Sequence, residues 1–171
     1  MLPLPTSLFL RSGKASSLDT AVILAILHAG KGTEWEKSDE VAATLDKLIE
    51  VFKPVYALNK GRAVPALGRY PEDKYDGVGI TGANPWFLCT LAVAEYLYKL
   101  SSGVSAEGVT VTGVSKGFYA RFGLREGQEV EPGSDELAKL KGDLIGLGDQ
   151  FVRVVKEFVP SDGSMSEQYD K

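Results

Sequence analysis

Cysteine and histidine are nearly missing from this chain of 171 residues, which contains one of each, Cys89 and His28. A single cysteine cannot form a disulfide within the chain, and the two residues together supply too few ligands for a thiolate or imidazole metal site. A Ser–His–Asp triad would have to use His28, which lies among apolar residues near a predicted helix end, where a packing or capping role is the simpler interpretation. Cys89 lies in an apolar helical run without a basic neighbour that could activate it. We therefore predict neither a metal site nor a cofactor.

The chain also has no long hydrophobic run and no cluster of basic residues. Its longest apolar run, Ala21 to Leu27, is far shorter than the roughly 20 residues that a membrane-spanning helix needs. Pro3 and Pro5 interrupt the apolar patch near the start, which therefore makes a poor secretion signal. The net charge of -4, without a Lys- or Arg-rich run, argues against a nucleic acid or an anionic membrane as the partner, so we expect a neutral one.

Hydrophobic residues make up 44% of the chain and charged residues 25%, which is enough for one domain with a core. Apolar residues recur with the period of a helix, and no strand pattern of useful length, internal repeat or low-complexity segment interrupts them. Capping residues and helix breakers predict four substantial helices. They run from a cap at Ser16 or Ser17 to a stop at Gly30 and Gly32, from Ser38 to Phe52, from Asn84-Pro85 to about Leu100, and from Ser134 to Phe158. We therefore predict an all-α fold.

The third predicted helix is apolar on most of its faces. Thr90, Glu95 and Lys99 leave it little polar surface, so we expect an inner helix that is covered nearly all round. The Gly-rich region from Val104 to Val130 predicts a long connection, with a short helix or irregular structure near Lys116 to Phe122.

The connection from Gly68 to Asn84 is crowded with arginine, acidic and aromatic residues. Such a loop suits a carbohydrate site, because Asp and Arg side chains can hydrogen-bond sugar hydroxyls while Tyr and Trp rings stack on sugar C–H faces. By residue type alone, Arg69 and Asp73 could equally pair with each other and stiffen the loop.

A second connection, from Pro160 to Lys171, carries Glu167 beside an amide and several hydroxyl groups. A carboxylate held in this way could act as a general base that activates water. Taken by itself, however, a solvated carboxylate on a frayed terminus is the simpler interpretation.

Five segments together resemble the fungal glucoamylases of glycoside hydrolase family 15. They are RSGKASSLDT, FKPVYALN, GRYPED, NPWFLCTLAVAE and GSMSEQYDK, and they follow one another in the family's order over most of the chain. The resemblance implies an inverting hydrolase that releases β-D-glucose from the non-reducing ends of starch, maltose, malto-oligosaccharides and related α-glucans. It also implies that Glu167, in the SMSEQ segment, is the general base that deprotonates the hydrolytic water.

The same resemblance implies a set of substrate-binding residues. It assigns sugar hydroxyl contacts and their hydrogen-bonding shell to the RYPED segment, and the lining of the substrate funnel to two aromatic residues; the set is Arg69, Tyr70, Asp73, Tyr75 and Trp86. Asp19 and His28 match non-catalytic positions. The turn from Tyr75 to Asn84 is longer than in the short-loop members of the family, so contacts within it are not transferred.

The family's catalytic domain is an (α/α)6 barrel, and the resemblance implies that residues 1–171 form a single fragment of it, with the upstream half and the last helices absent. The general acid of the family lies on a Trp-Glu-Glu segment upstream of RSGK. Glu34-Trp35-Glu36 falls after RSGK and is followed by Lys37, so we interpret it as a surface segment.

Two functions therefore remain open. The chain is either part of a starch-degrading glucoamylase, secreted as its relatives are and inactive when isolated, or a non-catalytic carbohydrate-binding or structural remnant of that domain. A Trp-Glu-Glu segment encoded upstream of Met1 would favour the enzyme.

Overall fold

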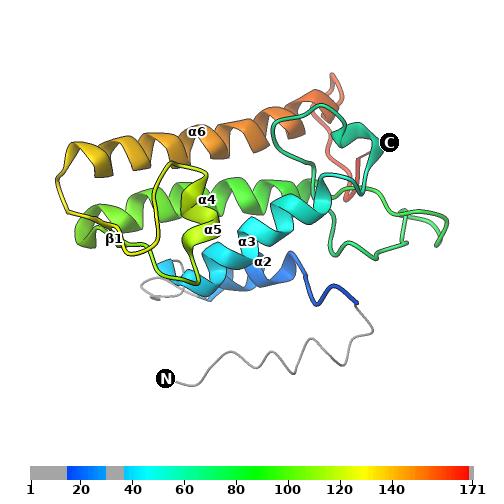
Figure 1. Cartoon of the computed structure of the whole chain (residues 1–171). Helices are drawn as coiled ribbons and strands as arrows, with labels where there is room; N and C mark the ends of the chain where they lie inside the picture. The colour runs from blue at the N-terminus through cyan, green and yellow to red at the C-terminus, as the bar shows by residue number, and fades with distance from the viewer. Residues whose placement is uncertain (1–14, 30–36, 170–171) are drawn as a thin grey trace.

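The computed structural model describes residues 15–29 and 37–169, which form a layered helical bundle (Figure 1). Its elements in chain order are α2 (Ala21–His28), α3 (Asp39–Phe52), the short 3-10 helix η2 (Ala57–Asn59), α4 (Phe87–Glu107), β1 (Val109–Thr110), α5 (Lys116–Ala120), β2 (Glu129–Val130) and α6 (Asp135–Phe158). The all-α prediction is confirmed, because each of the two strands in the described residues is only two residues long. None of the described helices is long and apolar enough to cross a membrane. The predicted helix stop at Gly30 and Gly32, the Glu34-Trp35-Glu36 segment and the poor secretion signal lie outside the described residues.

Helix α4 lies in the middle of the bundle. It packs along α6 on one side and against α2 on the other. Most of its side chains from Cys89 to Leu100 are buried, and Thr90 is fully buried among them. The predicted inner helix is therefore confirmed; Glu95 is exposed, as a charged residue should be, and so is Leu88, which is 53% exposed near the N-terminus.

Local sequence correctly predicts the starts of α3 and α6. The hydroxyl of Ser38 accepts the N–H of Val41 at 3.2 Å, and that of Ser134 accepts the N–H of Leu137 at 3.1 Å. Each hydroxyl satisfies a backbone donor that the first turn of a helix leaves free.

The predicted cap of α2 is wrong, since the helix begins only at Ala21. The side chain of Ser16 instead donates to the carboxylate of Glu72 at 3.0 Å, and Ser17 adopts a left-handed backbone conformation with φ of 56°. Asp19 takes over part of the capping role, because its Oδ1 accepts the N–H of Ala21 at 2.9 Å.

The predicted ends of α4 are also displaced. The amide of Asn84 donates to the carbonyl of Asp76 at 3.2 Å, and Trp86, with extended backbone, is the N-cap. Gly103 lies within the helix and does not end it. A Cβ atom at this position would lie 3.3 Å from Lys37 Cγ, so the glycine allows the two segments to approach closely. The helix ends at Gly108, whose φ is 75°.

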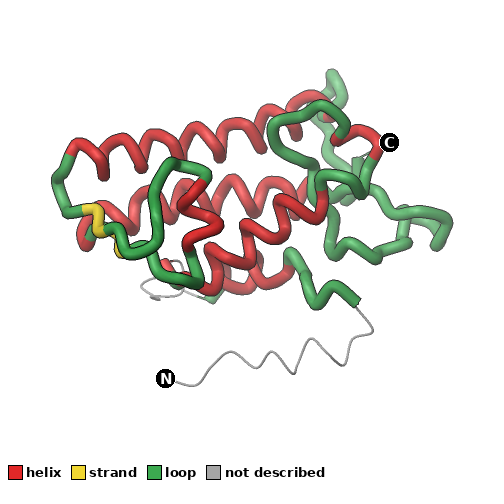
Figure 2. The backbone as a smooth tube through the Cα atoms, viewed as in Figure 1, coloured by secondary structure: helices red, strands yellow, loops and turns green. Residues whose placement is uncertain are grey.

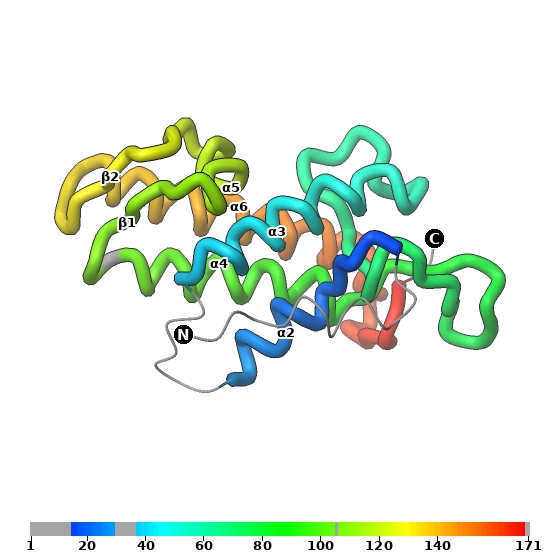
Figure 3. Tube along the Cα trace, turned by 60° about the horizontal axis from the view of Figure 1, so that its bottom comes forward, coloured from blue at the N-terminus to red at the C-terminus, as the bar shows by residue number. Residues whose placement is uncertain are grey.

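The long connections gather at one end of the bundle. Residues 53–86 and 159–169 lie there in Figure 1 and again in the turned view of Figure 3, and Figure 2 draws them as green loops, apart from the short red helix η2. The antiparallel β1–β2 pair lies at the opposite end. The two connections that carry most of the predicted chemistry therefore share one end of the molecule.

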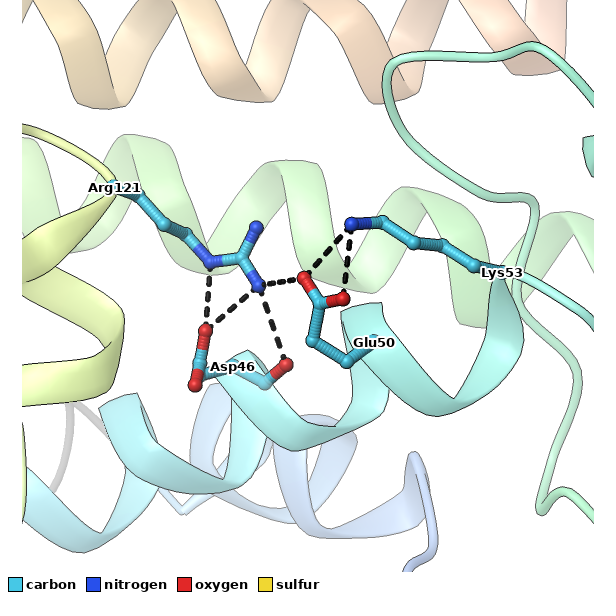
Figure 4. Close-up of polar contacts among 4 residues, drawn as sticks. All are labelled: Asp46, Glu50, Lys53 and Arg121. Carbon is cyan, nitrogen blue, oxygen red and sulfur yellow. Dashed lines mark hydrogen bonds and ion pairs between the residues drawn. The ribbon is translucent and has the colours of Figure 1, made fainter.

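A network of charges fastens the end of α5 to α3 (Figure 4). Arg121 Nε donates to Asp46 Oδ1 at 2.7 Å, and Arg121 Nη2 lies 2.5 Å from Glu50 Oε1. Lys53 Nζ contacts the same Glu50 carboxylate at 2.8 Å. The hydrogen bonds from Lys53 and Arg121 lower the pKa of Glu50 from its ordinary value of 4.5.

Replacing Arg121 with Met should lower the free energy of unfolding at pH 7 by about 1 kcal/mol or less, because Glu50 is half exposed and solvent screens the interaction. A lowered pKa means that ionised Glu50 stabilises the fold above pH 4.5, and that this contribution is lost as the pH falls through the lowered pKa. Urea unfolding at several pH values should show the difference from the wild type shrinking below pH 4.5. Arg125→Met, at an exposed arginine, is the control, and a difference that stays constant down to pH 3 would contradict the assignment.

Candidate active site

The segment that carries Glu167 is held across the N-terminus of α4. Phe87 donates its N–H to the carbonyl of Glu167 at 3.2 Å, and Tyr169 donates its N–H to the carbonyl of Pro85 at 3.1 Å. These two bonds form an isolated antiparallel bridge. The bridge places Glu167, whose side chain is exposed, beside the segment that contains Trp86.

Thr90, in the first turn of α4, links two loops near this bridge through its hydroxyl group. Its hydroxyl lies 2.8 Å from Tyr169 Oη and accepts the N–H of Leu67 at 3.0 Å. The ring of Tyr169 lies against Phe87 and Phe158, with centroids 4.4 and 5.0 Å away. A buried hydroxyl on the inner helix therefore joins the start of the RYPED loop to the C-terminal segment.

Arg69 is oriented by the N-terminal part of the chain. Its Nε lies 3.1 Å from Oδ1 of Asp19, a side chain that is only 3% exposed, and its carbonyl accepts the N–H of Thr20 at 2.8 Å. Of the two possibilities that the sequence left open, a structural ion pair of Arg69 with Asp73 is not found among the described residues, because the packing of α2 brings Asp19 to the guanidinium instead. The Arg69 side chain remains 44% exposed and can contact a ligand.

Asp73 shapes the loop in which it lies. Its Oδ1 accepts the N–H of Tyr75 at 3.0 Å, and its own N–H donates to the carbonyl of Tyr70 at 3.1 Å. Tyr70 is half-buried, whereas Tyr75 is 40% exposed and donates its hydroxyl to the carbonyl of Gly77 at 2.9 Å. The loop is therefore a turned segment with an outward-facing aromatic ring.

The pKa of Cys89 also indicates that four charged residues lie around one place in the structure. Burial raises the pKa of the Cys89 thiol to about 12; Arg69 lowers it, and Asp19, Asp73 and Glu167 raise it. All four charges thus act on one buried sulfur atom near the start of α4. The raised pKa keeps Cys89 a thiol, which agrees with the prediction that it is no nucleophile.

Several buried polar atoms around the bridge have no hydrogen-bond partner among the described residues. They are Asn84 Oδ1, Trp86 Nε1, Gln168 Oε1 and, beneath the loop, Tyr56 Oη. Burial, followed by the charge of Asp73, raises the pKa of Tyr56. Buried polar groups are normally paired, so this end of the molecule holds unused hydrogen-bonding capacity.

A hollow of about 640 Å³ lies elsewhere, between the end of α5 and α6. Its lining includes Arg121 and Lys139, and both cations are already paired, with Asp46 and with Asp143. None of the six predicted site residues lines it. We therefore place the candidate site where the loops converge, because that is where charged, aromatic and unpaired polar groups meet.

Sequence reasoning missed three residues that build this arrangement. The sequence assigns Asp19 to a non-catalytic position and shows Thr90 only as one of the few polar residues on its helix. Gln168 has no predicted role beyond being a neighbour of Glu167. Thr90 and Asp19 are fully or almost fully buried. A polar residue inside an apolar helix was the available signal for Thr90, since such a group needs a buried partner.

Comparison with known proteins gives a consistent result. The sequence model of the family described as glycosyl hydrolases family 15 matches residues 6–171. The glucoamylase of Blastobotrys adeninivorans is 32% identical over 174 residues, which cover 93% of this chain and 28% of the relative. Glucoamylase-1 of Schizophyllum commune is 33% identical over 171 residues, which cover 93% of this chain and 29% of the relative.

Solved structures show the same likeness. The Hormoconis resinae glucoamylase superposes with a TM-score of 0.82 at 27% identity, over 94% of this chain and 29% of that structure. The family 15 glucoamylase from Hypocrea jecorina gives 0.79 at 28% identity, over 94% of this chain and 28% of that structure. These structures confirm the predicted fold class, part of an (α/α)6 barrel, and the chain spans less than a third of their length.

Proposed function

This chain belongs to glycosyl hydrolase family 15, and from that premise we propose that it is part of an enzyme that hydrolyses starch and related α-glucans from their non-reducing ends, releasing β-D-glucose with inversion. The observation that carries the proposal is the bridge that holds Glu167 beside Trp86 and the loop of Arg69. Maltose and malto-oligosaccharides are further expected substrates. By family resemblance we also propose an extracellular location.

In this mechanism Glu167 is the general base. Its exposed carboxylate takes a proton from a water molecule as that water attacks the anomeric carbon from the face opposite the leaving oxygen. Inversion requires the second carboxyl group about 6.5–9.5 Å away, so that the water fits between the two. That general acid comes from sequence outside this chain.

The remaining predicted residues bind the sugar. Arg69, oriented by Asp19, donates to glucose hydroxyls, and Tyr70 and Asp73 belong to the same hydrogen-bonding shell. Tyr75 and Trp86 supply ring surface for the C–H faces of the sugar. The unpaired amide and indole groups near the bridge add hydrogen-bonding capacity.

The alternative is a non-catalytic carbohydrate-binding or structural remnant, in which the carboxylates near Glu167 have structural roles only. Asp19 and Asp73 are the two carboxylates that, together with Glu167, raise the pKa of the Cys89 thiol. Asp19 is paired with Arg69, and Asp73 accepts the N–H of Tyr75. Neither is placed as a free general acid.

Glucose release distinguishes the two functions. A complete family 15 catalytic domain that carries this chain should release glucose from soluble starch, and proton NMR of the first turnovers should show the β anomer. The 171-residue chain by itself should release none, because it lacks the general acid. An α-anomeric product would overturn the inverting mechanism, and a complete domain without glucose release would favour the remnant.

A further inference from the structure

The hollow between the end of α5 and α6 is separate from the candidate active site. Its volume of about 640 Å³ lies within the range of about 300–1,000 Å³ that is usual for small-ligand pockets. Arg121 and Phe122, directly after α5, line one wall, and a single face of α6 lines the other. The residues of that face recur at helical spacing and are Lys139, Gly142, Asp143, Gly146, Leu147 and Gln150.

Two glycines leave this face of α6 bare. Apart from proline, glycine is the least favourable residue in a helix interior, so Gly142 and Gly146 need a reason. Gly148 on the same helix has a packing reason, because a Cβ atom there would lie 2.8 Å from the ring of Tyr98. At Gly142 and Gly146, a Cβ atom would meet nothing within 4 Å. No packing contact among the described residues therefore explains these two glycines, whereas a ligand that lies flat on the helix would.

The wall opposite the glycines carries a fixed aromatic ring. Phe122 is half-buried, and its ring meets that of Phe118 edge to face, with centroids 5.4 Å apart and an interplanar angle of 73°. Phe118 is fully buried, so the ring of Phe122 is held in place from below. Leu147, half-buried on α6, adds an aliphatic surface. Both walls therefore offer apolar surface to a ligand.

The hollow also offers hydrogen-bonding groups that the fold leaves unused. Arg121 binds Asp46 and Glu50 through Nε and Nη2, and Figure 4 shows its Nη1 turned away from both carboxylates. Asp143 accepts the ammonium group of Lys139 through Oδ2 alone. The half-buried amide of Gln150 has no hydrogen-bond partner among the described residues. A ligand in the hollow can therefore find both donors and acceptors.

The charges at the hollow already compensate one another. The ion pairs that reach it join three cations and three anions, namely Arg121, Lys53 and Lys139 with Asp46, Glu50 and Asp143. An ionic ligand would add a charge without a partner to this balanced set, which is unfavourable in a partly desolvated place. The ligand that fits is uncharged, with hydroxyl groups for the polar side chains and C–H faces for Phe122 and Leu147. Sugars have this chemistry.

We infer that the hollow is a second carbohydrate site without a catalytic role, which binds glucosyl units of an α-glucan. The choice of a neutral sugar rests on the hollow itself, and only the choice of an α-glucan rests on the proposed function. The hollow shares no residue with the site around Glu167. A polymer bound at the hollow is held close to that site, so its chain ends reach Glu167 at a raised effective concentration.

An NMR titration of the full 171-residue chain tests the inference. The reporter of the hollow is the δ methyl signal of Leu147, the reporter of the candidate active site is the indole N–H of Trp86, and Val114, 53% exposed and outside the hollow, is the methyl control. Maltoheptaose should shift Leu147 and Trp86 but not Val114. Cellopentaose, which has β-linked glucosyl units, should shift Leu147 less, and inorganic phosphate should shift none of the three.

A variant that fills the hollow gives the test in terms of affinity. Gly146→Leu should raise the Kd that Leu147 reports for maltoheptaose about 10-fold or more, because the new side chain occupies the place of the sugar, and should leave the Kd that Trp86 reports unchanged. Ala138→Leu, at an exposed position of α6 outside the hollow, is the matched control and should change neither Kd. Both variants should unfold at or above the wild-type temperature, since leucine is the better helix former.

The two reporters separate failure of this site from failure of the proposed function. If Trp86 responds to maltoheptaose and Leu147 does not, or if Gly146→Leu keeps the wild-type Kd at Leu147, the second site is wrong and the proposed function stands. A response of Leu147 without one of Trp86 supports the second site and contradicts the proposed function. If neither responds, both fail.

Three further results would each overturn part of the inference. A shift of Leu147 by phosphate and not by sugars would refute the neutral ligand. An equal response to cellopentaose would refute the assignment to α-glucans. If Gly146→Leu lowers the unfolding temperature of a complete family 15 domain but not that of the 171-residue chain, another segment of the domain fills the hollow, and no sugar binds there.

Discussion

Changing Glu167 to Gln in a complete family 15 domain that carries this chain should lower kcat by roughly 10²- to 10⁴-fold or more and leave KM nearly unchanged. The amide keeps the size and shape of the side chain, but it cannot accept a proton from water at neutral pH. The fold uses Glu167 through its carbonyl, which accepts the N–H of Phe87, and this bond is independent of the side chain. The variant should therefore bind glucan normally and fail in the chemical step.

Steady-state hydrolysis of maltoheptaose measures both constants, and thermal unfolding checks the fold. Glu131→Gln is the matched control, because Glu131 is an exposed carboxylate directly after β2, the strand at the opposite end of the bundle. It should retain wild-type kcat. Turnover that is unimpaired in Glu167→Gln would remove Glu167 from the role of general base, even if the complete domain hydrolyses starch.

Changing Gly108 to Ala should lower the free energy of unfolding by about 2–5 kcal/mol. Gly108 ends α4 with φ of 75° and ψ of -163°, a conformation that is essentially confined to glycine. A Cβ atom there would lie 2.3 Å from the carbonyl oxygen of Val130 and 3.1 Å from Pro132. The contact is with backbone, so it can be relieved only by moving β2 and with it the start of α6.

Gly133→Ala separates the two contributions to this effect. Gly133 also has a positive φ, 77°, but a Cβ atom there meets nothing within 4 Å. Its variant should lose only the conformational term, about 1–2 kcal/mol. Urea unfolding of both variants gives the comparison. Equal losses would show that the β2 backbone yields without cost and would contradict the close packing at the end of α4.

The helices themselves follow from local sequence. Ser38 and Ser134 cap α3 and α6 as predicted, because a capping hydroxyl needs only a backbone N–H three residues away. The apolar surface of α4 predicts its central place. The same local reasoning fails at Asn84 and Ser16, whose side chains are used by Asp76 and Glu72 instead. A partner outside the helix decided both cases.

For the candidate site, the residue types and motif order in the sequence determined the family and the six predicted positions. Their spatial arrangement depended on segments far apart along the chain. Asp19 reaches Arg69 across 50 residues, and Thr90 reaches Tyr169 across 79.

The sequence by itself determined the helical class, the caps of α3 and α6 and the chemistry that the loops carry, because these depend on residue type and on neighbours within about one helical turn. Only the tertiary structure decided that Glu167 lies beside Trp86, that Arg69 pairs with Asp19, and that Val78 and Ile80 face solvent. The reason is physical: burial of α4 between α2 and α6 brings its N-terminus and the two loops to one place, and no local pattern encodes contacts across that packing.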